Sequence, residues 1–344
     1  MGIKNFHSFL RKKVPHIYKQ VHLSELRHEK LSIDTSIYMC KYKNSYGNRW
    51  LEGFYNLILF LINYDINFIF VLDSKAPPEK ELERESRILL REKNRARIDL
   101  ILDEWEKYNK DNPKRLEYNE EDFKECDNLF NFLKKKKINY PLEKENLIKI
   151  LYKLQKNLIS IASSDFDLLK EMFDLMGVSY YLADSEAEGT CSLMNRNALV
   201  DGVLTEDTDV MAYGTPVMFY GLNMKDHTVQ MLRLSDVLES LDISFNQLQD
   251  FCIMCGTDYN TNIDRIGPSK SFDLIYSNGS LEKLTEKMDT SILNYERVRE
   301  LFNCDKYELQ ISEFNTTDKL TLDTSSLRKF CFYNNITFQK LMNL

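Results

Sequence analysis

Short apolar runs that end in acidic residues recur along this chain, and they constrain its fold more than any other feature. Helical patterns precede the second and third runs, at 52–64 and 166–177. Strands that alternate with helices are typical of an α/β fold. The sequence therefore predicts a mainly parallel central sheet with flanking helices. The six predicted strands are 31–38, 66–73, 178–184, 199–207, 216–220 and 228–234.

The bulk composition fits a globular chain inside a cell. Of its 344 residues, 43% are hydrophobic and 29% are charged, which is ordinary for a globular protein. The longest apolar run, 57–64, is far shorter than the roughly 20 residues of a membrane span, and the N-terminus shows no signal-peptide pattern. Seven cysteines without a secretory signal predict reduced thiols. We therefore expect an intracellular protein with no membrane partner.

A C-x-x-C pair, Cys252 and Cys255, raises the question of a zinc or redox site. No second pair and no nearby histidine accompany it. We interpret the two residues as small core side chains on one helix.

Acidic residues stand at the ends of four predicted strands, and one more follows a helical pattern. In open α/β sheets, sites form outside the carboxyl ends of the strands, so these side chains are expected to share one pocket. Carboxylates that lie close together cannot all stay ionised without cations. Clusters of oxygen ligands favour Mg²⁺, for which Mn²⁺ can substitute. Two such ions about 4 Å apart can activate a water and stabilise the leaving oxygen in phosphodiester cleavage. The candidate ligands are Asp34, Asp73, Glu186, Glu188, Asp207, Asp209 and Asp258.

A local alternative exists for one of these pairs. Ser185 and Glu188 form an S-x-x-E pattern, which is typical of a capping box at a helix N-terminus. On that interpretation the serine caps the helix, and the glutamate bonds back to a backbone N–H.

The chain resembles the flap endonuclease branch of the XPG-like structure-specific 5′ nucleases. The matching segments follow the order of that family and span most of the chain. They are MGIKNF, IDTS, VLDSKAPPEK, LMGVSYYLADSEAEGTCSLM, GVLTEDTDVMAYGTPV and FCIMCGTDYNTNIDRIGPSKSFDLI.

The resemblance implies a role for each matching position. Asp34, Asp73, Glu186 and Glu188 correspond to one group of metal ligands, and Asp207, Asp209 and Asp258 correspond to the other. Lys80 and Arg87 correspond to basic residues that contact the scissile phosphate. Gly2 corresponds to a glycine that lies near the site and the DNA.

A basic stripe supports DNA binding from the residues themselves. Lys80, Arg84, Arg87, Arg91 and Arg95 follow one another at spacings of three or four, which places them on one face of a long predicted helix. Such a face suits a phosphate backbone. A solvated face balanced by nearby glutamates is the alternative for Arg84 and Arg91.

Residues 262–271 resemble the helix–two-turn–helix of the family. Gly267 permits close approach of a DNA backbone, and Pro268 suits the first turn of a helix. The N–H groups at that start, near Ser269 and Lys270, are expected to bind a duplex phosphate. The resemblance also implies K⁺ bound by the carbonyls of Asn262, Ile263 and Ile266.

The sequence departs from the family in three places. Cys40 stands where the family has an aromatic residue that stacks on a base. The insertion at roughly 108–148 is longer than usual, and we find no sliding-clamp binding motif. We expect a monomer at a nuclear or cytoplasmic (viral) replication site.

The expected organisation is one nuclease domain over residues 1–344. Its successive parts are an N-terminal nuclease part at 1–78, a helical arch or cap at 79–165, an internal nuclease part at 166–240, a helix–two-turn–helix region at 241–290 and a C-terminal helical part at 291–344.

The predicted function is Mg²⁺-dependent 5′ nuclease activity on branched or flapped double-stranded DNA. Lys134 to Lys137 are interpreted as a solvated run, with a DNA patch or a nuclear signal as alternatives. Holliday-junction resolution and 5′–3′ exonuclease activity remain alternatives, because they use the same carboxylates. A non-catalytic scaffold that binds branched DNA is a further alternative.

Overall fold

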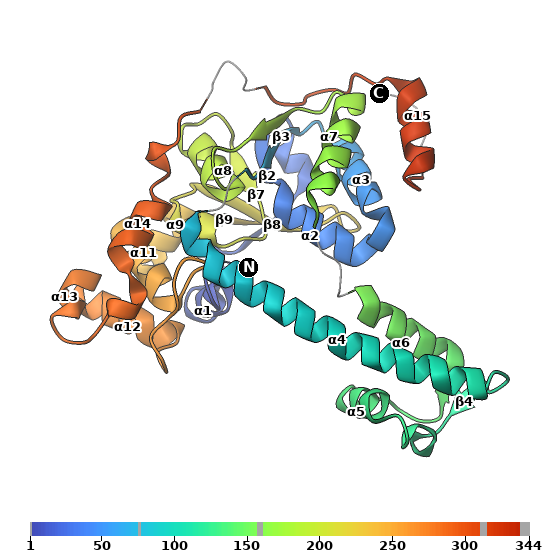
Figure 1. Ribbon diagram of the computed structural model, residues 1–344. Coiled ribbons are helices and arrows are strands. Elements are labelled where there is room, and N and C mark those ends of the chain that lie inside the picture. Colours follow the sequence, from blue (N-terminus) through green and yellow to red (C-terminus); the bar gives the residue numbers. More distant parts are fainter. Residues whose placement is uncertain (1, 75–76, 157–160, 310–314, 338–344) are drawn as a thin grey trace. The chain divides into compact units, whose positions relative to one another are not determined.

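A computed structural model describes residues 2–74, 77–156, 161–309 and 315–337 of the chain (Figure 1). The chain divides into two compact units. The first contains residues 1–42, 49–81 and 162–344, and the second contains residues 43–48 and 82–161.

The first unit is built on a seven-stranded sheet of order β1-β9-β8-β7-β2-β3-β6. The five consecutive strands from β8 to β6 are parallel, whereas β9 is antiparallel to β8 and to β1. The predicted mainly parallel sheet is confirmed. The strands are β1 Lys19–His22, β2 Lys30–Asp34, β3 Asn67–Leu72, β6 Tyr180–Leu182, β7 Gly202–Leu204, β8 Val217–Asn223 and β9 Thr228–Arg233.

Helices cover this sheet. The helices that lie wholly or mainly in the first unit include α1 Phe6–Lys13, α2 Thr35–Tyr46, α3 Trp50–Asn63, α7 Ser163–Met176, α8 Ala187–Arg196, α9 Asp209–Ala212 and α10 Leu234–Leu241. Helix α8 packs on β2, β3 and β7, and α3 packs on β3 (Figure 1). Because helices flank it, β3 is buried from Phe68 to Leu72, as continuous apolar strands of parallel sheets are.

Two details of the strand prediction were wrong. The first predicted strand, 31–38, ends at Asp34, and α2 begins at Thr35. Asp34 itself helps to start that helix, because its carboxylate accepts a hydrogen bond from the Ile37 N–H at 3.4 Å. Strand β1 was not predicted, because only Val21 of its four residues is buried and such an edge strand has little apolar pattern.

The C-terminal part of the first unit forms a group of helices. The helices are α11 Phe245–Cys255, α12 Pro268–Asn278, α13 Leu281–Thr285, α14 Tyr295–Phe302 and α15 Thr324–Tyr333. Cys252 and Cys255 are buried on α11, as predicted. Pro268 opens α12, which confirms its expected place in a first turn.

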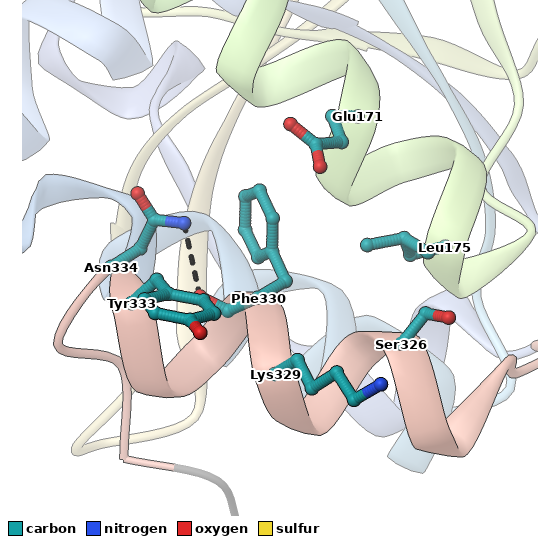
Figure 2. A pocket seen from close by; sticks show the side chains of 7 residues that line it. All are labelled: Glu171, Leu175, Ser326, Lys329, Phe330, Tyr333 and Asn334. Atoms are coloured by element: carbon teal, nitrogen blue, oxygen red, sulfur yellow. Dashed lines mark hydrogen bonds between the residues drawn. The ribbon is translucent and has the colours of Figure 1, made fainter.

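Helix α15 packs on α7. In Figure 2, Phe330 points from α15 toward α7, where Glu171 and Leu175 lie opposite it. These side chains line a pocket of about 310 Å³. Asn334 closes the end of α15 by donating a hydrogen bond to the Phe330 carbonyl at 2.9 Å.

The second unit is helical and has its own hydrophobic core. Its elements are α4 Glu81–Asp111, β4 Glu117–Tyr118, α5 Asp127–Lys135, β5 Leu142–Glu143 and α6 Lys144–Lys156. Ile101, Trp105, Tyr118, Phe123 and Leu129 are buried together at its centre. The expected division of the chain into five parts remains a prediction. No described helix combines the length and hydrophobicity needed to cross a bilayer.

Candidate active site

Parallel strands deliver the predicted acidic residues to one edge of the sheet. Asp34 ends β2, Asp73 follows β3, and Asp207 follows β7. Glu186 and Glu188 lie at the start of α8, just after β6, and Asp209 opens α9. Electrostatic repulsion links the group: Asp34 interacts with Asp73 and Asp207, Glu188 with Asp34 and Glu186, and Asp209 with Asp258. The structure therefore brings all seven carboxylates into one cluster.

Hydroxyl and backbone donors fix several of these carboxylates. Thr205 Oγ1 donates a hydrogen bond to Asp34 at 2.9 Å, and Ser36 donates one to Asp73. The Asp209 N–H donates to Asp207 at 3.0 Å. Thr205 lies directly after β7, and the other two donors lie in the first turns of α2 and α9, so the segments that follow the strands hold the carboxylates in place.

The capping-box interpretation of Ser185 and Glu188 is wrong. Glu186 is the N-cap residue of α8, and its side chain makes no capping hydrogen bond. The N–H of Ala187, at the first helical position, donates a hydrogen bond to Asp73 instead, at 2.6 Å. Asp73 thus joins the end of β3 to the start of α8, and the glutamate side chains are left for the cluster.

Burial changes the protonation of the cluster. It is the largest cause that raises the pKa of Asp34 to about 7, and the charges of Asp73 and Asp207 add to it. Burial also raises the pKa of Glu188 and of Asp209 well above the ordinary values. Some carboxylates of such a cluster take up protons unless nearby cations neutralise their charge.

Lys80 supplies one positive charge inside the cluster. Its ammonium contacts Glu186 and lies 3.6 Å from an Asp258 oxygen. Burial lowers the pKa of Lys80, but the charges of Glu188 and Glu186 outweigh it, so the pKa is raised overall. Lys80 therefore stays charged and acts as a counter-ion to the carboxylates.

Two tyrosines beside the cluster were not predicted from the sequence. The Tyr259 hydroxyl donates a hydrogen bond to Glu186, and Lys80 Nζ lies 5.3 Å from the centre of its ring. Tyr213 shares a 2.7 Å hydrogen bond with the same hydroxyl. The position of Tyr259 directly after Asp258 was the one available signal.

Gly2 lies against the cluster. Its φ of +79° is strained for other residues, and a Cβ there would lie 2.1 Å from Asp207 Oδ1 and 2.9 Å from the Asp209 nitrogen. A glycine is therefore required at this contact.

The donor set fits a hard divalent cation. The cluster offers oxygen ligands, as Mg²⁺ prefers, and Asp209 Oδ1 is buried without a hydrogen-bond partner. Within residues 2–74, 77–156, 161–309 and 315–337, no three His, Cys, Asp or Glu side chains are close enough to hold a metal ion as they stand. Binding of a metal ion would therefore require the carboxylate side chains near Lys80 to change their rotamers.

The predicted basic stripe is divided between two elements. Lys80 belongs to the 3-10 turn Pro78–Lys80 of the first unit, and the long helix expected from Glu79 onward begins two residues later, at Glu81. Arg84, Arg87 and Arg91 lie on α4 in the second unit. Arg84 and Arg91 are exposed, and Arg87 is half-buried. The contacts proposed for them with DNA remain predictions.

The predicted helix–two-turn–helix residues lie around the start of α12. Gly267 is its N-cap, and no atom lies within 4 Å of the place where a Cβ would stand. Ser269 and Lys270 are exposed in the first turn. The carbonyls of Ile263 and Ile266 converge, since the Asn262 amide donates to them at 3.3 and 3.2 Å. Binding of K⁺ there remains a prediction.

Family models and a viral relative match most of the chain. The XPG N-terminal domain matches residues 1–94, and the XPG I-region matches residues 177–258. A probable RAD2-like endonuclease of Invertebrate iridescent virus 3 is 32% identical, over 89% of this chain and 86% of the viral protein.

Two solved structures share the fold. The catalytic core of Rad2 in complex with a DNA substrate is 18% identical, with a TM-score of 0.61 over 95% of this chain and 93% of that chain. Flap endonuclease-1 from Methanococcus jannaschii is 21% identical, with a TM-score of 0.59 over 92% of this chain and 90% of that chain. The two family models and the viral relative show that this chain belongs to the XPG-like family of flap and RAD2-like endonucleases.

Proposed function

We propose that this protein is a Mg²⁺-dependent structure-specific 5′ nuclease that cuts phosphodiesters near single-strand/duplex junctions in branched DNA. The observation that carries the proposal is the cluster of seven carboxylates at one sheet edge, with Lys80 among them. Membership of a nuclease family supports it.

The side chains of the cluster would divide the work. Asp34, Asp73, Glu186 and Glu188 would hold one metal ion, and Asp207, Asp209 and Asp258 would hold the other. Such ions supply an activated water and stabilise the leaving oxygen. Lys80 would exchange its contact with Glu186 for one with the scissile phosphate, and Arg87 would bind the same group.

The substrate would be held by three further sets of groups. Gly2 would approach the DNA near the cluster, and Arg84 and Arg91 would contact phosphates along α4. The start of α12, with Gly267, Ser269 and Lys270, would bind the duplex, supported by K⁺ on the carbonyls of Asn262, Ile263 and Ile266. We propose a monomer that acts at an intracellular site of DNA replication or repair.

The decisive experiment is cleavage of end-labelled DNA in the presence of Mg²⁺. The substrates are a double flap, a nicked duplex, a four-way junction and a single strand. EDTA and the Asp207→Ala variant serve as negative controls. Asp236→Ala is the matched control, because Asp236 pairs with Lys19 on the surface and not with the cluster.

One cut at the base of the flap, absent with EDTA and in Asp207→Ala, would support the proposal. Paired cuts in the four-way junction would identify a resolvase, and a ladder from the 5′ end would identify an exonuclease. Tight flap binding with no cleavage in Mg²⁺ or Mn²⁺ would overturn the proposal in favour of a scaffold.

A further inference from the structure

Tyr213 is a buried residue at the end of α9, the helix that Asp209 opens. It is the C-cap residue of that helix, and its N–H donates a hydrogen bond to the Asp209 carbonyl at 3.1 Å. The side chain is 2% exposed. Its ring stands across the ring of Phe302 on α14, with 5.0 Å between the ring centres and 82° between the planes. Tyr213 is therefore fixed by α9 at its backbone and by α14 at its ring.

Gly189 leaves space for the Tyr213 ring on α8. A Cβ on Gly189 would lie 3.2 Å from Tyr213 Cε1 and 2.8 Å from Tyr307 Cε2. Glycine is unfavourable inside a helix, and the close approach of these two rings accounts for it here. Two tyrosine rings therefore reach the first turn of α8, next to Glu186, the N-cap residue of that helix.

The Tyr213 hydroxyl reaches Glu186 through Tyr259. The two tyrosine hydroxyls share a hydrogen bond of 2.7 Å, and the Tyr259 hydroxyl donates a second one to Glu186. Tyr307 makes a further hydrogen bond with Tyr213. Glu186 is 5% exposed and Tyr259 is 8% exposed, so little water can reach these groups to replace a lost partner.

The direction of these hydrogen bonds follows from the number of protons. A phenol carries one proton. Tyr259 gives its proton to Glu186, so its oxygen can only accept in the hydrogen bond with Tyr213. Tyr213 is therefore the donor to Tyr259. Because successive hydrogen bonds polarise one another, the bond from Tyr213 strengthens the bond from Tyr259 to Glu186.

Packing accounts for the ring of Tyr213 but not for its hydroxyl. A phenylalanine ring would fill the same space against Gly189 and Phe302, and it would bring no polar group into the interior. Burying a hydroxyl costs free energy unless the hydroxyl is hydrogen-bonded. The hydrogen bond with Tyr259 is thus the feature of Tyr213 that packing leaves unexplained.

The chain of hydroxyls also joins the two proposed groups of metal ligands. Tyr213 ends the helix that Asp209 opens, and Tyr259 directly follows Asp258. Their hydrogen bonds lead to Glu186, which belongs to the other group. The position of Glu186 therefore depends on residues that are attached to the opposite group.

We propose that Tyr213 is a positioning residue for Glu186 and that it acts through Tyr259. Tyr213 holds the Tyr259 phenol in place, and Tyr259 holds the Glu186 carboxylate in the orientation that binds a metal ion. Hydrogen-bond partners of metal ligands orient those ligands and tune their affinity for the metal. The inference rests on the proposed function, because Glu186 is a metal ligand only in that proposal.

Binding of Mn²⁺ to the whole protein in the absence of DNA tests the proposal. Isothermal titration calorimetry gives the Kd, so cleavage plays no part. The variants are Tyr213→Phe, Tyr259→Phe and the double variant. The matched control is Tyr118→Phe, which removes a buried hydroxyl of the second unit whose hydrogen bond, of 3.2 Å, goes to the Arg115 carbonyl.

We expect Tyr213→Phe to raise the Kd for Mn²⁺ about threefold and Tyr259→Phe to raise it about tenfold, because only Tyr259 contacts the ligand itself. Tyr118→Phe should keep the wild-type Kd. A wild-type Kd in Tyr213→Phe, or an equal rise in Tyr118→Phe, would overturn the proposal.

The double variant separates positioning through Tyr259 from a general effect on the fold. It should bind Mn²⁺ like Tyr259→Phe alone, because Tyr213 acts on Glu186 through the hydroxyl that Tyr259→Phe has already removed. Independent effects would instead multiply to about thirtyfold. A thirtyfold loss in the double variant would show that Tyr213 does not act through Tyr259, and it would overturn the proposal.

Cleavage of the double flap separates this inference from the proposed function. If the wild type cuts, the Mg²⁺ concentration for half-maximal cleavage should rise about threefold in Tyr213→Phe, and the rate at saturating Mg²⁺ should stay within about twofold. A lower saturated rate with an unaltered Mg²⁺ requirement would overturn the positioning role. If the wild type binds Mn²⁺ but cuts no DNA, the proposed function fails, and calorimetry still decides the role of Tyr213.

Discussion

Tyr259 touches two charged groups of the cluster at once. Its hydroxyl donates to Glu186, and its ring lies beside the Lys80 ammonium. We predict that Tyr259→Phe raises the Mg²⁺ concentration needed for half-maximal cleavage about tenfold, because partners of metal ligands typically contribute 10–100-fold to metal affinity. A Mg²⁺ titration of the cleavage rate measures it.

The control for this prediction is Tyr276→Phe, which removes a hydroxyl from a half-exposed side chain on α12. Calorimetric titration with Mg²⁺ gives a second readout that does not depend on cleavage. The same Mg²⁺ requirement in both variants would show that Tyr259 does not position Glu186.

Gly2 has a conformation and a neighbour that only glycine tolerates. We predict that Gly2→Ala lowers the cleavage rate at least about tenfold, because the new Cβ would displace Asp207 and because φ is positive. The cleavage rate of Gly221→Ala provides the comparison, since Gly221 also has a positive φ, of +62°, but a Cβ there would meet no described atom closer than 3.6 Å. Wild-type cleavage by Gly2→Ala would contradict the close contact with Asp207.

The acidic residues were predictable from sequence, whereas the groups that hold them were not. Carboxylates at strand ends are distinctive, because their position follows from the local strand pattern. Thr205, Ser36 and Tyr259 are ordinary residues until the strands assemble. Their partners are 171, 37 and 73 positions away, so no local pattern indicates them.

Two ion pairs of Arg299, with Asp250 and with Glu282, join three helices of the C-terminal group. Asp250 of α11 is 1% exposed and accepts a hydrogen bond from Arg299 of α14 at 2.8 Å. We predict that Arg299→Met lowers the free energy of unfolding by about 3 kcal/mol, because it leaves a buried carboxylate without its partner. Urea denaturation followed by circular dichroism measures the change.

Arg297→Met is the matched control on the same helix. Arg297 pairs with Glu79 and Glu300 on the surface, where its side chain is 45% exposed, and such pairs contribute at most about 1 kcal/mol. Equal destabilisation of the two variants would contradict the special role of Asp250.

The third member of this network, Glu282 of α13, makes the stability of the fold depend on pH. Its hydrogen bond with Arg299 lowers its pKa to about 2, below the ordinary value of about 4.3. The ionised carboxylate therefore stabilises the fold above pH 4, and this contribution is lost as the pH falls toward 2. We predict that Glu282→Gln is less stable than the wild type at pH 7.

Urea midpoints at pH 7, 5, 4 and 3 test the sign of this effect. The difference between Glu282→Gln and the wild type should shrink as the pH falls, because the protonated glutamate resembles glutamine. A difference that grows toward low pH would show that the hydrogen bond with Arg299 does not depend on the charge of Glu282.

Helices and strands inside the fold were predictable from the sequence, whereas an edge strand and the end of a strand were not. β3 and α3 were predicted because each is a long apolar segment, and such segments are buried in any folded chain. β1 was not, because an edge strand needs only one buried residue. The end of β2 was misplaced because Ile37 and Tyr38 continue its apolar pattern into α2.

The whole molecule carries one tryptophan in each compact unit. Trp50 is buried in the first unit and Trp105 in the core of the second, and the chain has no other. Because the second unit has its own core, we predict separate unfolding transitions. Trp50→Phe leaves Trp105 to report on the second unit, and Trp105→Phe leaves Trp50 to report on the first.

Mg²⁺ should stabilise only the unit that holds the carboxylates. At a concentration 100 times Kd, bound metal adds about 2.7 kcal/mol to the stability of the form that binds it. We therefore expect Mg²⁺ to shift the transition reported by Trp50 and to leave that reported by Trp105 in place. Coincident transitions that shift together would show that the two units unfold as one.

The proposed ligands are widely spaced along the chain, and this has a consequence for engineering. Asp34 and Asp73 precede residues 82–161, the longer segment of the second unit, whereas the five other acidic residues follow it. A chain divided in the connection between α5 and α6 would yield two fragments, each with an incomplete set of ligands. Neither fragment alone would cut DNA, and their reassociation would restore cutting, so the divided protein would serve as a reporter of proximity between two fused partners.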